Sequence, residues 1–504
     1  MKFASLFNQP FNLNLNQIRL ITALLSLTLS IVAFALDNLI NSDGVLYMNM
    51  ARALIEDGFS AMADLYDWPF FAILTAGVHI LTGFPLERCG EIINIAMFVV
   101  FTDALVLICA KMLPNHRQVF IAALFILGFT LFLDYRAYLF RDLGYWAFIS
   151  LGLYQFIRFI EVPSWKNAFL WQVAMVIAIL FRIEGVAITV LLPIFLLYHR
   201  TTLKQASKEI LMLWSSFMFI GAIVALIAMS FGTVAEAFGK LSQIWGYLDF
   251  QNKADEFYKR AVIIDAQVMS RFAKEDGALI LASGLLVMMT QKFITALSIG
   301  YIIFYLITRY SKQAPTYLAP PPYKAMFIYF IGINFIILAG FVFDKYFLST
   351  RYSVMLITAL FLLMLPRFCQ FVENAVINKR KATLAFTAFV LIAGPIDSLT
   401  SSVYKGYVKE TALWAAENIP EGTRTRTFDV ISDYYFREYG FRQDIELDVG
   451  MRSTKFADID YVILVNKRHD TGTIQKFENL GFKVIFSTGN RRGDQSLVLK
   501  SENE

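Results

Sequence analysis

The chain has 504 residues, of which 57% are hydrophobic and only 17% are charged. Soluble proteins carry about 25% charged residues, so this chain needs lipid as the solvent for most of its surface. The composition excludes a water-soluble enzyme, cytoplasmic or secreted, and a disordered protein. Basic loops between apolar segments account for the net charge of +5, which implies no nucleic-acid partner.

The chain has too few cysteines and histidines for disulfide bonds or a metal site to stabilise the fold. The three cysteines lie in or beside apolar stretches and predict no disulfide framework, and the four scattered histidines predict no metal cluster. The first apolar run is longer than the core of a signal peptide and lacks a clean cleavage site. We therefore expect it to remain as a membrane span.

Charge density divides the chain into two expected domains. Residues 401–504 contain 31 of the 85 Asp, Glu, Lys and Arg residues, a much higher density than residues 1–400. We expect a polytopic α-helical membrane domain at 1–400 and a soluble domain at 401–504. Two longer outer loops are expected within the membrane domain, at 41–87 and 232–279.

Apolar runs long enough to cross a bilayer predict about 11 membrane-spanning helices, within a range of about 10 to 13. The expected spans are 17–39, 88–110, 118–134, 143–160, 168–182, 186–198, 209–231, 280–308, 325–343, 352–366 and 382–400. The runs 168–182 and 186–198 could instead form a re-entrant hairpin. The run 280–308 contains Lys292 and could be a juxtamembrane helix followed by a span.

Alternate loops between the expected spans are basic, and this bias sets the predicted orientation. The basic residues are Lys2, Arg19, Lys111, Arg117, Arg158, Lys166, Arg200, Lys204, Lys208, Arg309, Lys312, Lys324, Arg367, Lys379, Arg380 and Lys381. The loop after the first span is acidic instead. The positive-inside rule then predicts a cytoplasmic N-terminus, and an odd number of spans predicts a periplasmic C-terminal domain.

Shorter elements are expected outside the spans. Residues 45–55 are amphipathic, and residues 69–81 are apolar but short for a span, which suits helices at the outer membrane interface. The C-terminal domain is predicted to be a small α/β domain, with helices at 410–418 and 475–480 and strands at 461–465 and 482–486.

Asp43 is the most informative candidate, because it follows the first span by a few residues. A carboxylate at a membrane mouth can act as a general base toward a hydroxyl or amine, or bind a divalent cation that meets a phosphate. The alternative is a solvated N-cap of the amphipathic helix that follows.

Arginines on the outer side form the second group of candidates. Three of these residues lie between two expected spans, namely Arg136, Arg141 and Asp142. Arg351 directly precedes the expected span 352–366. Guanidinium groups bind phosphate through bidentate, charge-assisted hydrogen bonds, and outer loops are normally poor in arginine. The alternatives are arginines that extend to lipid head groups and a local pair of Arg141 with Asp142.

Other charged residues could support the same site. Arg182 and Glu184 interrupt an apolar stretch, where ionisable groups indicate either a functional site or a self-neutralising pair. Asp64 and Asp67 precede the interfacial helix and could belong either to an outer site or to a polar loop.

Together these motifs resemble GT-C superfamily membrane glycosyltransferases, in particular the protein-mannosyltransferase-like and aminoarabinose-transferase-like group. The segments that carry the resemblance are Asp43-Gly44-Val45-Leu46-Tyr47-Met48-Asn49-Met50-Ala51, Trp68-Pro69, Thr82-Gly83-Phe84, Glu87-Arg88-Cys89-Gly90-Glu91, Arg141-Asp142, Arg182-Ile183-Glu184-Gly185 and the stretch from Tyr404 to Pro420. The resemblance covers the order of parts along the chain more than its individual letters.

The resemblance implies a GT-C-like fold and the transfer of a sugar from a polyprenyl-phosphate-linked donor, by inverting displacement. The acceptor would be a cell-envelope glycan, a lipid or a protein at the outer face of a bacterial inner membrane. Asp43 carries over as the catalytic residue that accepts the acceptor's proton. The donor phosphate is expected to bind Arg136, Arg141 and Arg351. The expected supporting residues are Asp64, Asp67, Asp142, Arg182 and Glu184.

Two departures from the family pattern affect these expectations. Relatives often have Lys-Pro-Pro where this chain has Asp67-Trp68-Pro69, so either another basic residue binds the phosphate or the donor differs. Gly44 stands where many relatives have a second acid, which weakens the case for a bound metal. No cofactor is therefore predicted with certainty, and a divalent cation stays an open alternative.

Two other classes of function also remain open. A secondary transporter or flippase of lipid-linked substrates usually shows internal repeats and charges at the bilayer midplane. No repeat is visible here, and the isolated Asp103 and Lys292 within spans suit helix packing as well as function. A non-catalytic membrane scaffold is the other alternative, and it should tolerate Asp43→Asn.

Overall fold

The computed structural model describes residues 12–36, 39–231, 249–270, 272, 275–311, 320–401, 406–439, 445–449, 456, 458–470 and 472–502. Lys2, Lys312, Tyr404 and residues 232–248 of the second outer loop lie outside these residues. The chain forms two compact units. The first comprises Met1–Leu27, Ala96–Asp134 and Arg141–Pro395, and the second comprises Thr28–Ile95, Tyr135–Phe140 and Ile396–Glu504.

The first unit is helical. Its elements are α7 (His116–Leu127), α8 (Thr130–Leu133), α9 (Asp142–Glu161), α10 (Trp165–Phe181), α11 (Glu184–Leu191), η1 (Leu192–Ile194), α12 (Phe195–His199), α13 (Leu203–Phe231), α16 (Phe250–Gln267), α17 (Gly277–Leu297), α18 (Ile299–Tyr310), α19 (Pro321–Lys345), η2 (Thr350–Ser353), α20 (Val354–Ile377) and most of α21 (Lys381–Ser401). Both α2 (Leu15–Leu36) and α6 (Leu86–Met112) contribute residues to each unit.

Six helices in the described part of the chain are long and apolar enough to cross a membrane, so the protein is an integral membrane protein. They are α2, α6, α9, α17, α19 and η2 joined to α20. Shorter apolar helices include α7, α10, α18 and α21. Each expected span coincides with one or more helices, because an apolar run in lipid must satisfy its backbone hydrogen bonds internally.

Two expected spans are interrupted. The run 118–134 divides into α7 and α8 at Gly128, where a Cβ atom would lie 2.9 Å from the carbonyl oxygen of Leu391. The run 280–308 divides at Ser298, which has a φ of 60°. That run could hold a juxtamembrane helix followed by a span, and this alternative stays a prediction. The 21-residue α17 is the candidate span, and the shorter α18 follows it.

Polar contacts join the expected inner loops of the first unit to one another. Glu161, the last residue of α9, binds Lys111 of α6 at 2.6 Å and accepts a hydrogen bond from the Tyr323 hydroxyl at 2.6 Å. Arg200, after α12, donates to the Ile160 carbonyl at 2.9 Å. The loops that the basic pattern assigned to one side of the membrane therefore contact one another, while their cytoplasmic location stays a prediction.

The second unit contains residues 41–87, the expected first outer loop, and the C-terminal domain. Its elements are α3 (Ser42–Glu56), α4 (Phe59–Leu65), α5 (Phe70–Thr82), α22 (Gly406–Asn418), β1 (Thr425–Thr427), α23 (Val430–Tyr439), β2 (Ile445–Leu447), β3 (Tyr461–Asn466), α24 (Gly472–Asn479), β4 (Phe482–Gly489) and β5 (Gln495–Ser501). The interfacial helix expected at 69–81 is α5, which ends at Gly83 in the left-handed conformation.

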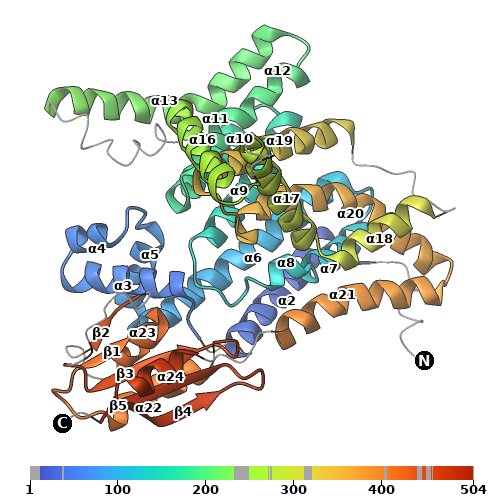
Figure 1. The fold of residues 1–504 in the computed structure, drawn as a ribbon. Helices are drawn as coiled ribbons and strands as arrows, with labels where there is room; N and C mark the ends of the chain where they lie inside the picture. The colour runs from blue at the N-terminus through green and yellow to red at the C-terminus, as the bar shows by residue number, and fades with distance from the viewer. Residues whose placement is uncertain are drawn as a thin grey trace. The chain divides into compact units, whose positions relative to one another are not determined.

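The C-terminal domain is a five-stranded sheet in the order β2-β1-β3-β5-β4 (Figure 1). β1 pairs in parallel with both β2 and β3, whereas β5 is antiparallel to β3 and β4. Alternating residues of β3 serve two apolar clusters. Ile463 packs with residues of α22 and α23, and Val462 packs with Phe477 of α24. The predicted α/β domain is confirmed, although β1, β2, β5 and α23 were not foreseen.

Candidate functional site

Arg182 is the centre of a charged cluster in the first unit. It follows the last residue of α10, and its extended backbone ends that helix before α11 begins at Glu184. The guanidinium group forms ion pairs with both Asp142 and Glu184, and its Nε donates to Glu184 Oε2 at 3.1 Å. Because Arg182 is only 8% exposed, its two carboxylate partners offset the free energy of removing its charge from water.

Close packing of α9 against α10 sets the position of Arg182. A Cβ atom on Gly144 of α9 would overlap the ring of Phe181, the last residue of α10. A Cβ atom on Gly185 would lie 3.1 Å from the backbone nitrogen of Ile179. Small residues on both sides therefore let α10 and α11 fold back on each other with Arg182 at the turn.

Two arginines face one aromatic ring beside this turn. The Cζ of Arg182 lies 4.9 Å from the ring centre of Tyr352, and the Cζ of Arg351 lies 5.0 Å from the same centre. Arg351 also donates to the Tyr352 hydroxyl at 3.0 Å. Cation–π contacts of this kind stabilise guanidinium groups where water is scarce. Tyr352 thus connects η2 to the turn that carries Arg182.

Arg141 completes the cluster. It is the N-cap residue of α9, and it acts electrostatically on the Glu184 carboxylate. We call Arg141, Asp142, Arg182, Glu184, Arg351 and Tyr352 the arginine cluster. It holds three guanidinium groups and two carboxylates, and both carboxylates pair with Arg182. Five of the nine site residues expected from the sequence belong to it.

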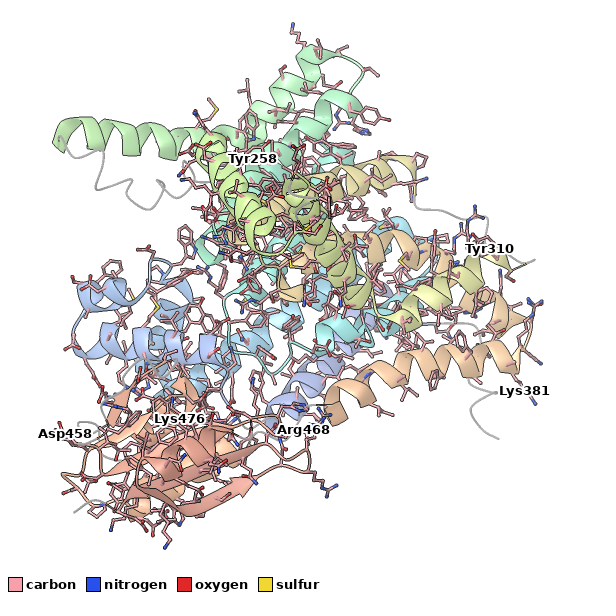
Figure 2. The ribbon with its side chains drawn as sticks, in the orientation of Figure 1. Tyr258, Tyr310, Lys381, Asp458, Arg468 and Lys476 are labelled. Atoms are coloured by element: carbon pink, nitrogen blue, oxygen red, sulfur yellow. The ribbon has the colours of Figure 1, made fainter. Side chains whose placement is uncertain are left out.

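Helix α16 of the second outer loop packs beside the segment that carries Arg351. Lys253 of α16 pairs with Asp344 near the end of α19, and the Cζ of Arg260 lies 4.2 Å from the ring centre of Tyr346. Tyr258 extends from the same helix and is 62% exposed (Figure 2). The described part of the second outer loop therefore contacts the connection that leads into η2.

Asp43 lies in the second unit, in the first turn of α3. It was weighed as an N-cap, but the N-cap residue is Asn41, so that alternative is wrong. The Asn41 side chain accepts from the Leu139 backbone nitrogen at 2.7 Å and donates to the Leu139 carbonyl at 3.2 Å. Asp43 is half-buried, and a carboxylate in the first turn of a helix is stabilised by the backbone N–H groups.

Gly44 explains the missing second acid. A Cβ atom there would lie 2.8 Å from Cγ1 of Ile40 and 2.9 Å from Cβ of Leu139. A longer side chain would push α3 away from the segment 135–140. The glycine is therefore required by the close approach of these two segments.

Arg136, also in the second unit, is buried rather than extended toward a lipid surface. It is 1% exposed, and its Nη1 donates to the Ser30 hydroxyl at 2.8 Å. Burial lowers the pKa of Arg136 to about 9, because desolvation penalises the charged form.

Other candidates take different roles. Asp64 and Asp67 are exposed, in the last turn of α4 and just after it. Asp103, which seemed isolated, pairs with Arg19 of α2 through two hydrogen bonds of 2.8 and 2.7 Å. Asp103 therefore fits the helix-packing alternative. Within the described residues, no group of three His, Cys, Asp or Glu side chains is arranged to hold a metal ion.

Sequence reasoning missed two tyrosines that the structure places in polar contacts. Tyr352 adjoins Arg351, but nothing in the sequence shows that its ring meets Arg182. Tyr435 of α23 bonds the backbone nitrogen of Ile40, which is 395 residues away, and no local pattern could predict that pairing.

No protein-family model matches the chain, and no curated protein sequence matches it. Solved structures do align with it. The crystal structure of apo ArnT from Cupriavidus metallidurans is 12% identical, and the alignment covers 95% of this chain and 97% of that chain with a TM-score of 0.41. A second ArnT structure, bound to undecaprenyl phosphate, is 12% identical and covers 96% and 98% with a TM-score of 0.43.

The arabinofuranosyltransferase AftD from Mycobacteria also aligns with this chain. It is 13% identical, and the alignment covers 96% of this chain and 42% of AftD with a TM-score of 0.46. The chain is thus similar over most of its length to the two ArnT structures and matches less than half of AftD.

Proposed function

We propose that the protein transfers a sugar from a polyprenyl-phosphate-linked donor to an acceptor at the outer face of the membrane. The observation that carries the proposal is the arginine cluster. It brings three guanidinium groups together, and guanidinium groups bind the phosphate group of a lipid carrier through charge-assisted hydrogen bonds. Transfer to a cell-envelope glycan, lipid or protein accounts for a site beside apolar helices.

The reaction would be a direct inverting displacement. The acceptor oxygen or nitrogen forms a bond to the anomeric carbon of the sugar as its proton passes to the Asp43 carboxylate. The bond between that carbon and the phosphate oxygen breaks, and its electron pair stays on the lipid phosphate. Arg141, Arg351 and Arg136 would stabilise this growing negative charge, and Asp142 and Glu184 would hold Arg182 in position.

Binding of the carrier tests the role of the arginine cluster. Purified full-length protein is titrated with undecaprenyl phosphate, and bound lipid is measured by native mass spectrometry. We expect Arg351→Gln to weaken binding about tenfold or more, because it removes charge-assisted hydrogen bonds to the phosphate.

The matched control is Arg309→Gln, which removes an exposed arginine from the end of α18. It should bind the lipid as the wild type does. Equal affinity of Arg351→Gln and the wild type would contradict the assignment of the phosphate to this cluster.

A further inference from the structure

Tyr435 joins the C-terminal domain to the start of α3 within the second unit. The residue is fully buried on α23. Its hydroxyl accepts a hydrogen bond from the Ile40 backbone nitrogen at 2.9 Å and donates to Glu87 Oε1 at 3.2 Å. We call these three residues the Tyr435 clasp. One side chain thus holds a backbone group and a carboxylate that are far apart in the sequence.

Charged contacts surround the clasp. Glu438, also on α23, pairs with Arg52 near the end of α3. Lys409 of α22 places its Nζ 4.8 Å from the ring centre of Tyr435. Helix α23 therefore contacts both ends of α3. The Tyr435 hydroxyl bonds Ile40 just before α3 begins, and Glu438 pairs with Arg52 near its end.

The segment held by the clasp leads directly to Asp43. Ile40 precedes Asp43 by three residues, and its side chain lies against Gly44. The next residue, Asn41, is fixed by its two hydrogen bonds to Leu139. Ile40 is therefore bonded to α23, and Asn41 is bonded to Leu139. Because both residues directly precede α3, the first turn of α3 has little freedom to move.

We infer that Tyr435 is a positioning residue, through which the C-terminal domain holds the Asp43 carboxylate in place for the reaction. The inference rests on the proposed function in that it assigns Asp43 the role of base. It makes the C-terminal domain part of the catalytic arrangement rather than an independent appendage. Loss of the Tyr435 hydroxyl should therefore loosen the residues before α3 and slow turnover without weakening donor binding.

Hydrogen exchange in full-length protein tests the clasp without reference to the reaction. In Tyr435→Phe the ring stays in place but can no longer accept the Ile40 hydrogen bond. We expect the Ile40 amide to exchange about five- to tenfold faster, the factor that corresponds to one lost hydrogen bond. The matched control is Tyr439→Phe, which removes a hydroxyl from the neighbouring half-exposed ring. It should leave the Ile40 amide unchanged.

Steady-state turnover of the polyprenyl-phosphate sugar that accumulates in cells lacking the protein tests the positioning role. Tyr435→Phe should lower kcat about five- to tenfold and leave the KM for the donor unchanged, because Asp43 would be misplaced while the phosphate site stays intact. Unchanged exchange at Ile40, or faster exchange with an unchanged kcat, would overturn the inference. A fully active Asp43→Asn variant would instead refute the proposed role of Asp43, while the exchange result would still decide whether the clasp exists.

Discussion

At the scale of single residues, the buried Arg182 and the half-buried Arg19 are each matched by specific partners. Arg182 has two carboxylates and an aromatic ring around it, and Arg19 has both oxygens of Asp103. Burying an arginine without such partners would cost several kcal/mol. Partners of this kind therefore keep the Arg182 side chain charged at its buried position.

Gly44 gives a prediction at this scale. We expect Gly44→Ala to lower the free energy of unfolding by about 1–3 kcal/mol, because the added methyl group would overlap Ile40 and Leu139. Thermal unfolding of the purified protein measures the change. The control is Gly77→Ala in α5, where a Cβ atom would meet no other atom within 4 Å. A variant Gly44→Ala as stable as Gly77→Ala would contradict the close approach.

The sequence could predict which charged residues lie together in the arginine cluster where charge is unusual for its position. Arg141, Asp142, Arg182, Glu184 and Arg351 stood out because arginines and acids at the edges of apolar runs are rare, and the structure brings all five together. Tyr352 and Tyr435 could not be predicted in the same way. A tyrosine has no unusual position in sequence, and its role here depends on partners from distant segments.

At the scale of elements, the contact between α9 and α10 controls the turn at Arg182. The ring of Phe181 occupies the space beside Gly144, whereas Gly152 of the same helix faces the terminal methyl group of Met175. The Phe181 ring is rigid and adjoins Arg182, but the end of a methionine side chain can rotate away. A methyl group on Gly144 would therefore displace the Phe181 ring, whereas one on Gly152 would displace only the end of the Met175 side chain.

This difference predicts unequal effects of two matched substitutions. Gly144→Ala should shift the end of α10, lower the free energy of unfolding by about 1–3 kcal/mol and weaken undecaprenyl phosphate binding. Gly152→Ala should cost less than about 1 kcal/mol and leave binding unchanged. Thermal unfolding and native mass spectrometry measure both effects. Equal behaviour of the two variants would show that Phe181 does not set the position of Arg182.

The helices were predictable as elements because the length of an apolar run is a local property. Their interruptions were not, since the break at Gly128 depends on the approach of α21 and the break at Ser298 depends on a single backbone conformation. The strands β1 and β2 have three residues each, too few for an alternating pattern to be recognised. Their place in the sheet comes from pairing with β3 and with each other.

At the scale of the whole molecule, the two units divide the candidate residues between them. The first unit contains the arginine cluster, and the second contains Asp43 and Arg136 together with the C-terminal domain. The expected domain boundary near residue 400 stays a prediction. The first outer loop and the C-terminal domain share a unit because α23 packs on α3, a long-range contact that composition alone does not reveal.

The most direct test of the central claim is a mass-spectrometric profile of lipid-linked sugars and envelope glycans. Cells lacking the protein are compared with cells rescued by the wild type, by Asp43→Asn or by Asp57→Asn, which changes an exposed acid at the other end of α3. Without the protein, we expect one polyprenyl-phosphate sugar to accumulate and one glycan, lipid or protein to lose that sugar. Wild type and Asp57→Asn should restore both, and Asp43→Asn should restore neither at equal expression. Full rescue by Asp43→Asn would contradict the account.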